Sequence, residues 1–140
     1  MPRTPLLAVA TMAAVLIPTL VCAQTDGPIL SGHYLYTDIA LCWNGTPPVL
    51  STKQSNGTVT FDRSSGKMKQ TLSVIDGPHL TVTGFSTVTS YALDVKYLTI
   101  GDARYRIFFG ASQDGVATSA TFSGITPDNS CSIQGTLSQK

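Results

Sequence analysis

The chain carries about eight short runs of alternating polar and apolar residues, and turn-forming residues separate one run from the next. Alternation with a period of two is the pattern of a β-strand that buries one face. Pairs such as Asn56-Gly57 and Asp114-Gly115 favour tight turns, so consecutive runs are expected to pair in antiparallel fashion. The predicted strands cover residues 33–43, 57–63, 67–75, 79–87, 90–100, 103–111, 116–125 and 131–138.

This pattern predicts an all-β fold. The chain contains no glutamate and is rich in threonine, serine, valine and tyrosine, a balance that favours strands over helices. Sequential antiparallel strands must bury one apolar face and protect two edges, and closure of the sheet does both. We therefore predict a single up-and-down meander of about eight strands in a closed or nearly closed barrel of calycin-like shape. A β-sandwich is the alternative.

One stretch interrupts the strand pattern. Residues 45–55, which include Pro47-Pro48, are predicted to form a loop. The segments Asn44-Gly45-Thr46 and Asn56-Gly57-Thr58 match the pattern for N-glycosylation. Asn-Gly is also an ordinary turn signal, and we favour the turn interpretation for both.

The segment Ser31-Gly32-His33-Tyr34 is similar to the Gly-x-Trp motif that opens the first strand of lipocalins, with Tyr34 in the place of the tryptophan. The predicted architecture likewise resembles the barrels of the lipocalin and avidin type. The resemblance implies a shape for the chain, and a shape alone implies no function.

The first residues have the layout of a secretory signal. Arg3 precedes an apolar run from Leu6 to Val21, and Ala23 provides a small residue at the expected cleavage point. A membrane-spanning helix is the alternative, but Pro18 interrupts the run and no charged flank follows it. We predict that residues 1–23 are removed, and that residues 24–140 form a single secreted or periplasmic domain without a membrane span.

Two cysteines remain after this cleavage, Cys42 and Cys131, and a disulfide between them is the expected state outside the cytosol. In a closed eight-stranded meander the first and last strands are neighbours, and the line along which they pair is the seam of the barrel. The bridge would join the two strands across this seam. The histidines, His33 and His79, are isolated, so we expect neither a metal site nor another cofactor.

The charge balance excludes one class of partner. Removal of Arg3 lowers the number of lysines and arginines from nine to eight, against eight acidic residues. A formally neutral chain has no basic field that would attract nucleic acid or anionic lipid. We expect no nucleic-acid partner, and the sequence does not indicate an oligomeric state.

The predicted hairpin of residues 90–111 has two possible registers. A two-residue loop at Gly101-Asp102 would place its arginines on the apolar face, whereas a three-residue loop at 101–103 separates charged from apolar residues. We therefore favour the three-residue loop. One face then carries Tyr91, Leu93, Val95, Tyr97, Tyr105, Ile107, Phe109 and Ala111, and the other carries Asp94, Lys96, Arg104 and Arg106.

The predicted strand 33–43 has two unlike faces. One carries Leu35, Ile39, Leu41 and Trp43, and the other carries Tyr34, Tyr36, Asp38, Ala40 and Cys42. The first face is the more apolar, so we expect it to meet the core, with Trp43 capping the core or the mouth of the lumen. Whether the two tyrosines share the core is left open by the pattern.

Tyrosines combine a flat apolar wall with a hydrogen-bonding tip, which suits a binding site. The interior of an eight-stranded barrel is either filled by side chains or holds one small ligand, and both states stay open here. We predict non-enzymatic binding of a small apolar ligand. The candidate ligand-binding residues are Trp43, Tyr91, Tyr97 and Tyr105.

A protein-interaction module is the alternative function, such as an inhibitor of an extracellular enzyme or a component of a cell envelope. Arg104 and Arg106 share one strand face with Phe108, and apolar side chains among arginines are typical of an interface. The head from Gln24 to Leu30 has the length to reach into the cleft of a partner protein.

An enzyme is the least favoured class. Asp38 lies within a predicted strand and would form an acid–base pair if His33 or His79 lay beside it, although a simple hydrogen-bonded aspartate is the more common case. The chain has no Gly-x-Ser-x-Gly motif of the hydrolase nucleophile elbow. We therefore predict no catalytic residues.

Overall fold

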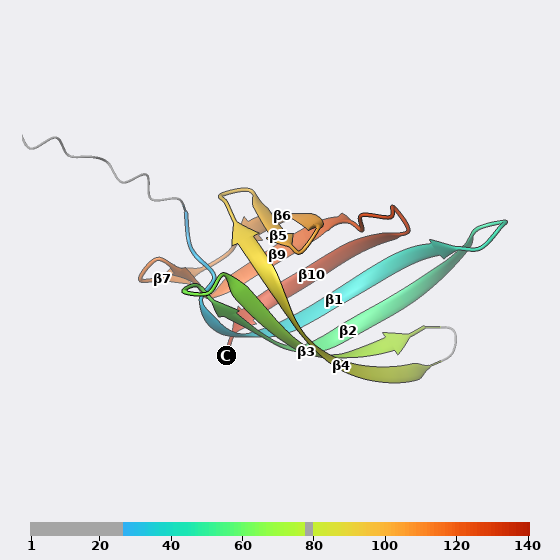
Figure 1. Ribbon diagram of the computed structural model, residues 1–140, viewed down its shortest axis with the longest axis horizontal. Coiled ribbons are helices and arrows are strands. Elements are labelled where there is room, and N and C mark those ends of the chain that lie inside the picture. Colours follow the sequence, from blue (N-terminus) through green and yellow to red (C-terminus); the bar gives the residue numbers. More distant parts are fainter. Residues whose placement is uncertain (1–26, 78–79) are drawn as a thin grey trace, which may run out of the picture.

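The computed structural model describes residues 27–77 and 80–140, and in this part of the chain eight strands form a closed antiparallel barrel (Figure 1). The predicted barrel is confirmed. Its strands are β1 (Gly32–Asn44), β2 (Val49–Asp62), β3 (Lys67–Asp76), β4 (Thr81–Leu93), β5 (Tyr97–Ile100), β6 (Ala103–Phe109), β9 (Ser119–Ile125) and β10 (Cys131–Gln139). The predicted signal at residues 1–23 lies outside the described residues.

The strands follow one another around the barrel as in a meander, in the order β1-β10-β9-β6-β5-β4-β3-β2. A small hairpin of β7 (Ser112–Gln113) and β8 (Val116–Ala117) interrupts the meander between β6 and β9. Within the described residues, no helix is long and apolar enough to cross a membrane.

The barrel closes where β1 pairs with β10, and the register of this seam runs from Tyr34 opposite Gln139 to Cys42 opposite Cys131. The predicted disulfide joins these two cysteines, whose Cα atoms are 4.0 Å apart. It closes a sequence separation of 89 residues. Such a bridge is worth on the order of 4 kcal/mol in the chain-entropy model, and it is compatible with an oxidising compartment.

The predicted loop at residues 45–55 is wrong over most of its length, because β2 begins at Val49. β2 pairs with β1 from Gly32 opposite Phe61 to Asn44 opposite Val49, which gives the backbone of this polar stretch its hydrogen-bond partners. The predicted turn at Asn56-Gly57 is wrong as well. Gly57 lies within β2, where an added Cβ would come within 2.1 Å of the Thr71 carbonyl oxygen, so close strand approach requires a glycine there.

The predicted strand 90–100 is divided: its first residues are the end of β4, which continues without the predicted break after residue 87, and its last residues form β5. The Asp94 side chain accepts hydrogen bonds from the backbone N–H groups of Lys96 (2.8 Å) and Tyr97 (2.7 Å), and this turn separates β4 from β5. Leu93 and Leu98 therefore lie opposite each other across the hairpin.

The favoured three-residue loop at 101–103 is also wrong, because Ile100 pairs with Ala103 and the loop consists of Gly101-Asp102. Because of the turn at Asp94, the residues of β5 that face inward are those that would face outward if the strand were uninterrupted. The two-residue loop therefore leaves the arginines on the outer face. Leu98, Tyr105 and Ile107 are buried inside the barrel, and Tyr97 lies outside with the two arginines.

The face of β1 that meets the core is the opposite of the predicted one. Tyr34, Tyr36 and Cys42 are buried, whereas Trp43 is 49% exposed. Tyrosine rings span the wide interior, and the ring centroid of Tyr34 lies 5.5 Å from that of Phe61. The buried Tyr34 hydroxyl donates a hydrogen bond of 2.7 Å to a backbone carbonyl, so its burial leaves no unpaired polar atom.

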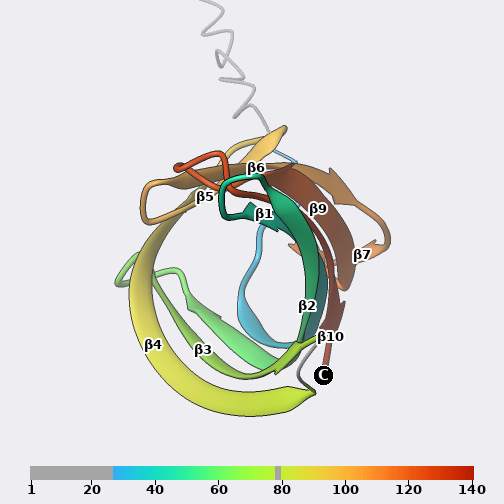
Figure 2. The same cartoon turned by 90° about the vertical axis from the view of Figure 1, so that its right-hand side faces the viewer.

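One end of the barrel, here called the closed end, is covered by the segment that precedes β1. The backbone of Ile29 exchanges hydrogen bonds of 2.9 and 2.8 Å with Gly115 and Ala117, and Leu30 is buried. Figure 2 shows this blue segment behind the ring of strands. Leu30 is therefore not free to reach a partner, which corrects that part of the predicted head at 24–30. Residues 24–26 lie outside the described range.

Candidate functional site

The other end of the barrel, here called the open end, is formed by the last residues of β1 and β3 and the first residues of β2 and β4. Figure 2 faces this end. Phe85 of β4 is opposite the buried Leu72 of β3, so both side chains point into the barrel. Phe85 is nevertheless 39% exposed, and the other inward positions of this part of β4 are also exposed: Thr81, Thr83 and Thr87. Solvent therefore reaches the inner wall of β4.

On β4 the exposure of inward-facing residues falls from the open end toward the closed end, whereas on β1 the inward-facing residues are buried from Cys42 to Tyr34. Phe85 at the open end is 39% exposed, Asp38 farther in is 8% exposed, and Tyr34 near the closed end is fully buried. The floor of this opening, as we use the term, consists of the inward residues that retain a small exposed fraction: Tyr36, Asp38, Ser55, Leu72 and Tyr105. The inner wall of β4 is thus accessible near the open end, whereas Leu30 and Tyr34 are buried near the closed end, beside a cavity of about 240 Å³ that Tyr91 and Leu93 help to line.

Asp38 is the acidic residue of the floor. Its neighbours across the two adjoining strands are Ser55 and Gly135, which carry no charge. The Tyr36 hydroxyl donates a hydrogen bond to Asp38 Oδ2. Asp38 Oδ1 is buried and accepts no hydrogen bond from the residues that the structure describes. A buried acceptor without a donor costs about 1–3 kcal/mol, so this atom is a candidate contact for a ligand.

The floor also holds two phenols in their protonated form. Burial raises the pKa of Tyr36 well above its usual value, and the nearby Asp38 carboxylate raises this pKa further. Burial, and then the same carboxylate, raise the pKa of Tyr105. Both hydroxyls therefore remain hydrogen-bond donors at neutral pH.

A second acidic side chain faces the opening from β3. Asp76 lies opposite Lys53 of β2, which in turn lies opposite the inward-facing Ala40 of β1. Asp76 Oδ1 is buried and, among the described residues, receives no hydrogen bond. In the described part of the chain, the inner wall near the opening thus carries two acidic side chains, Asp38 and Asp76, and one lysine, Lys53.

The predicted ligand-binding residues do not lie together. Tyr105 belongs to the floor, with its ring 5.7 Å from that of Phe122. Tyr91 is near the closed end, where its ring lies 4.9 Å from that of Phe61. Tyr97 and Trp43 lie on the outer surface, and the Arg104 guanidinium stacks 3.7 Å from the Tyr97 ring centroid.

Arg104, Arg106 and Phe108 lie on the outer face of β6, as predicted, with the Arg106 guanidinium 5.3 Å from the Phe108 ring centroid. Beside them is a groove of about 560 Å³. We call it the outer groove, because most of its lining residues occupy exposed positions of the strands: Thr37, Ile39, Gln54, Phe108, Thr121, Gln134 and Thr136. Asp38, Phe122, Ser123 and Gly135 also line it.

The conceivable acid–base pair of Asp38 with His33 is not formed. The two residues lie on opposite faces of β1, and the His33 ring is exposed and hydrogen-bonded to Thr60 Oγ1 at 2.9 Å. His79 lies outside the described residues. In the described part of the chain, no group of three histidine, cysteine or acidic side chains is arranged to hold a metal ion.

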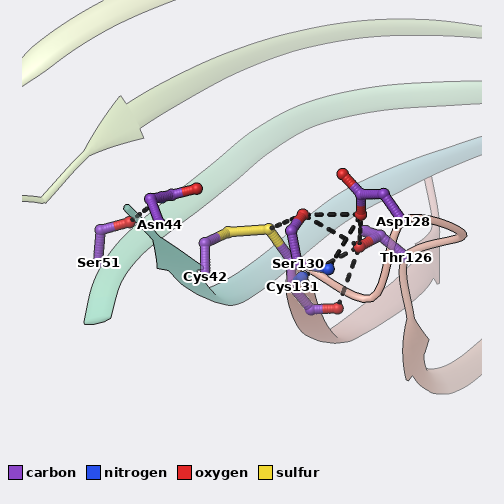
Figure 3. The surroundings of a disulfide bond; sticks show 7 residues. All are labelled: Cys42, Asn44, Ser51, Thr126, Asp128, Ser130 and Cys131. Carbon is purple, nitrogen blue, oxygen red and sulfur yellow. Dashed lines mark hydrogen bonds between the residues drawn. A yellow bond between two sulfur atoms is a disulfide. The ribbon is translucent and has the colours of Figure 1, made fainter. Parts of the chain in front are cut away.

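The disulfide lies at the open end, next to the turn between β9 and β10 (Figure 3). Asp128 in this turn accepts hydrogen bonds from Thr126 Oγ1 (2.6 Å) and from Ser130 Oγ (2.7 Å) and N–H (3.0 Å). These bonds lower the pKa of Asp128 to about 2. The Cys131 N–H donates to Thr126 Oγ1 at 3.0 Å, which links the turn to the start of β10.

Comparison of the chain with protein-family models, with curated proteins and with solved structures finds no match. The function is therefore inferred from the geometry of the two ends of the barrel and of its outer face.

Proposed function

We propose that the protein binds a small, mostly apolar molecule at the open end of the barrel, without catalysing a reaction on it. The observation that carries this proposal is the exposure of the inward-facing side chains of Thr81, Thr83, Phe85 and Thr87 on β4. A barrel filled by its own side chains would bury these positions.

The residues around the opening suit such a molecule. Leu72, Phe85 and Phe122 provide apolar surface, and the Tyr105 ring adds a flat wall. The polar groups are few and converge on the floor, which is the usual composition of a small-molecule site. A secreted or periplasmic location is part of this proposal and is supported by the disulfide and by the signal-like start of the sequence.

The test is a comparison of two bulky substitutions on neighbouring positions of β4. Thr83 faces inward and Val82 faces outward, and both are exposed. A ligand found by a thermal-shift screen and native mass spectrometry should bind T83W at least about tenfold more weakly and V82W unchanged. Equal binding by the wild-type protein and T83W would overturn the proposed site.

The outer groove favours a second function, the binding of another protein. Ile39 and Phe108 are both more than half exposed on its two sides, and apolar side chains beside arginines are typical of interfaces. The substitution F108S should then weaken capture of a purified extracellular partner without affecting small-molecule binding at the open end. T83W is the reverse control, because it should weaken small-molecule binding and leave capture of the partner unchanged.

A further inference from the structure

Asp38 Oδ1 is the unused hydrogen-bond acceptor of the floor. The residue is 8% exposed, its side chain points into the barrel with those of Tyr36 and Ala40, and no described residue donates to Oδ1. A carboxyl oxygen that carries no hydrogen acts as a hydrogen-bond acceptor. The group that this atom is suited to receive is therefore a donor, and a positively charged donor gives the strongest hydrogen bond.

The surrounding charges favour a cation over an anion. Among the residues that the structure describes, three charged side chains face the opening: Asp38 of β1, Lys53 of β2 and Asp76 of β3. Lys53 stands directly across from Asp76, whereas the residues directly across from Asp38 are uncharged. An anionic ligand would be repelled by two carboxylates. A cationic ligand would be repelled only by the ammonium group of Lys53, whose charge is offset by its acidic neighbour.

Aromatic rings complete the surroundings of Asp38. The ring centroid of Phe122 lies 5.5 Å from that of Tyr36 and 5.7 Å from that of Tyr105. Gly135, which is opposite both Asp38 and Phe122, leaves space for the Phe122 ring, because an added Cβ would lie 2.1 Å from it. Ring faces attract ammonium groups, and their apolar surface suits the body of an amphipathic molecule.

We propose that the ligand of the open end is a small amphipathic amine, and that its ammonium group donates a hydrogen bond to Asp38 Oδ1. This inference rests on the proposed function and adds the chemical class of the ligand. Tyr36 occupies Oδ2, so the site accepts one ammonium group at one oxygen. The apolar body of the amine lies toward Leu72 and Phe85, the inward residues on the path to solvent.

The experiment compares three probes that share a phenyl body and differ in the polar group: 2-phenylethylamine, 2-phenylethanol and 3-phenylpropionate. Their affinities for the oxidised mature protein are measured by calorimetry near pH 7. The amine should bind about ten- to a hundredfold more tightly than the alcohol, as expected for a charged hydrogen bond, and the carboxylate most weakly. D38N should remove the preference for the amine, and K53M should preserve it.

The outcomes separate this inference from the proposed function. If amine and alcohol bind equally and D38N changes neither, the ligand class is wrong, but a site at the open end stands. If no probe of any class binds and the thermal-shift screen finds no ligand, both are overturned. Should D38N fail to fold, the ¹³C shift of the Asp38 carboxyl on addition of 2-phenylethylamine to the wild-type protein decides: a shift supports the contact, and no shift refutes it.

Discussion

Cys42 and Cys131 lie directly opposite each other in the β1–β10 register, and their disulfide fastens the seam at which the barrel closes. The bond also lies at the open end, so it holds together the part of the barrel that carries the candidate site. The seam is the one place where strands from the two ends of the described chain pair with each other.

The first prediction concerns this bond. The double substitution C42A/C131A should lower the free energy of unfolding by about 2–5 kcal/mol, because the unfolded chain regains the freedom that the bridge removes. Urea unfolding followed by circular dichroism measures the change. A reducing agent should destabilise the wild-type protein and leave the double variant unaffected, and equal stability of the two proteins under oxidising conditions would contradict the prediction.

The second prediction concerns the hydrogen bond between Tyr36 and Asp38. Y36F removes the donor and leaves both carboxylate oxygens of Asp38 without a partner among the described residues, which should cost about 1–3 kcal/mol. Y97F is the matched control, since Tyr97 lies on the outer face, and it should change stability by less than about 0.5 kcal/mol. If Y36F and Y97F lowered the free energy of unfolding equally, the hydrogen bond between Tyr36 and Asp38 would not contribute to stability.

The third prediction concerns alkaline pH. The pKa values of Tyr36 and Tyr105 are raised in the folded state, so above pH 10.0, the ordinary value, the unfolded chain releases phenolic protons that the folded chain keeps. This contribution to stability is complete below that pH and is lost as the pH rises above it. The urea concentration at the midpoint of unfolding should fall as the pH is raised from 8 to 11, and it should fall less steeply for Y36F. A midpoint that does not change with pH would contradict the raised pKa values of the two tyrosines.

The fourth prediction concerns acid pH and the turn between β9 and β10. The pKa of Asp128 is lowered to about 2 from an ordinary value of 3.8, so its contribution to stability is present above 3.8 and lost as the pH falls toward 2. D128A should therefore lower the melting temperature at pH 6 and have a much smaller effect at pH 2. Thermal scans of both proteins at the two pH values test this, and a constant difference would count against it.

The fifth prediction concerns Gly135. G135A places a Cβ 2.1 Å from the Phe122 ring and should cost about 1–3 kcal/mol through overpacking. G84A is the control, because the nearest atom to a Cβ there is 4.0 Å away. Adding F122L to G135A should recover part of the loss, and strict additivity of the two changes in a double-mutant cycle would show that the residues are not coupled.

Much of the fold was predictable, for reasons that individual elements illustrate. Alternation and turn residues are local properties, so they indicated the antiparallel meander and the approximate number of strands. The pairing of Cys42 with Cys131 followed from the presence of two cysteines in a chain expected outside the cytosol, and it agreed with a closed barrel, whose first and last strands are neighbours. The division of the predicted strand 90–100 at Asp94 was missed, since an aspartate within an apolar run is compatible with either an outward strand position or a turn.

The candidate site was predictable only in part. The shared parity of Asp38 with Tyr34 and Tyr36 is visible in the sequence, but the more apolar opposite face was expected to meet the core. That expectation failed because the Tyr34 and Tyr36 rings are buried in the interior, where both hydroxyls donate hydrogen bonds, while the leucines and the isoleucine of the opposite face stay partly exposed outside. Of the four predicted ligand-binding residues, only Tyr105 lies at the floor.

The sequence by itself determined the all-β character, the succession of antiparallel neighbours and the disulfide, because these depend on residue periodicity, turn chemistry and chain order. Only the tertiary structure decided which face of β1 is buried, that the inner wall of β4 is accessible near the open end, and that Asp38 Oδ1 has no donor among the described residues. These features depend on how closure brings distant strands together. The contacts that result are absent from any local stretch of the chain.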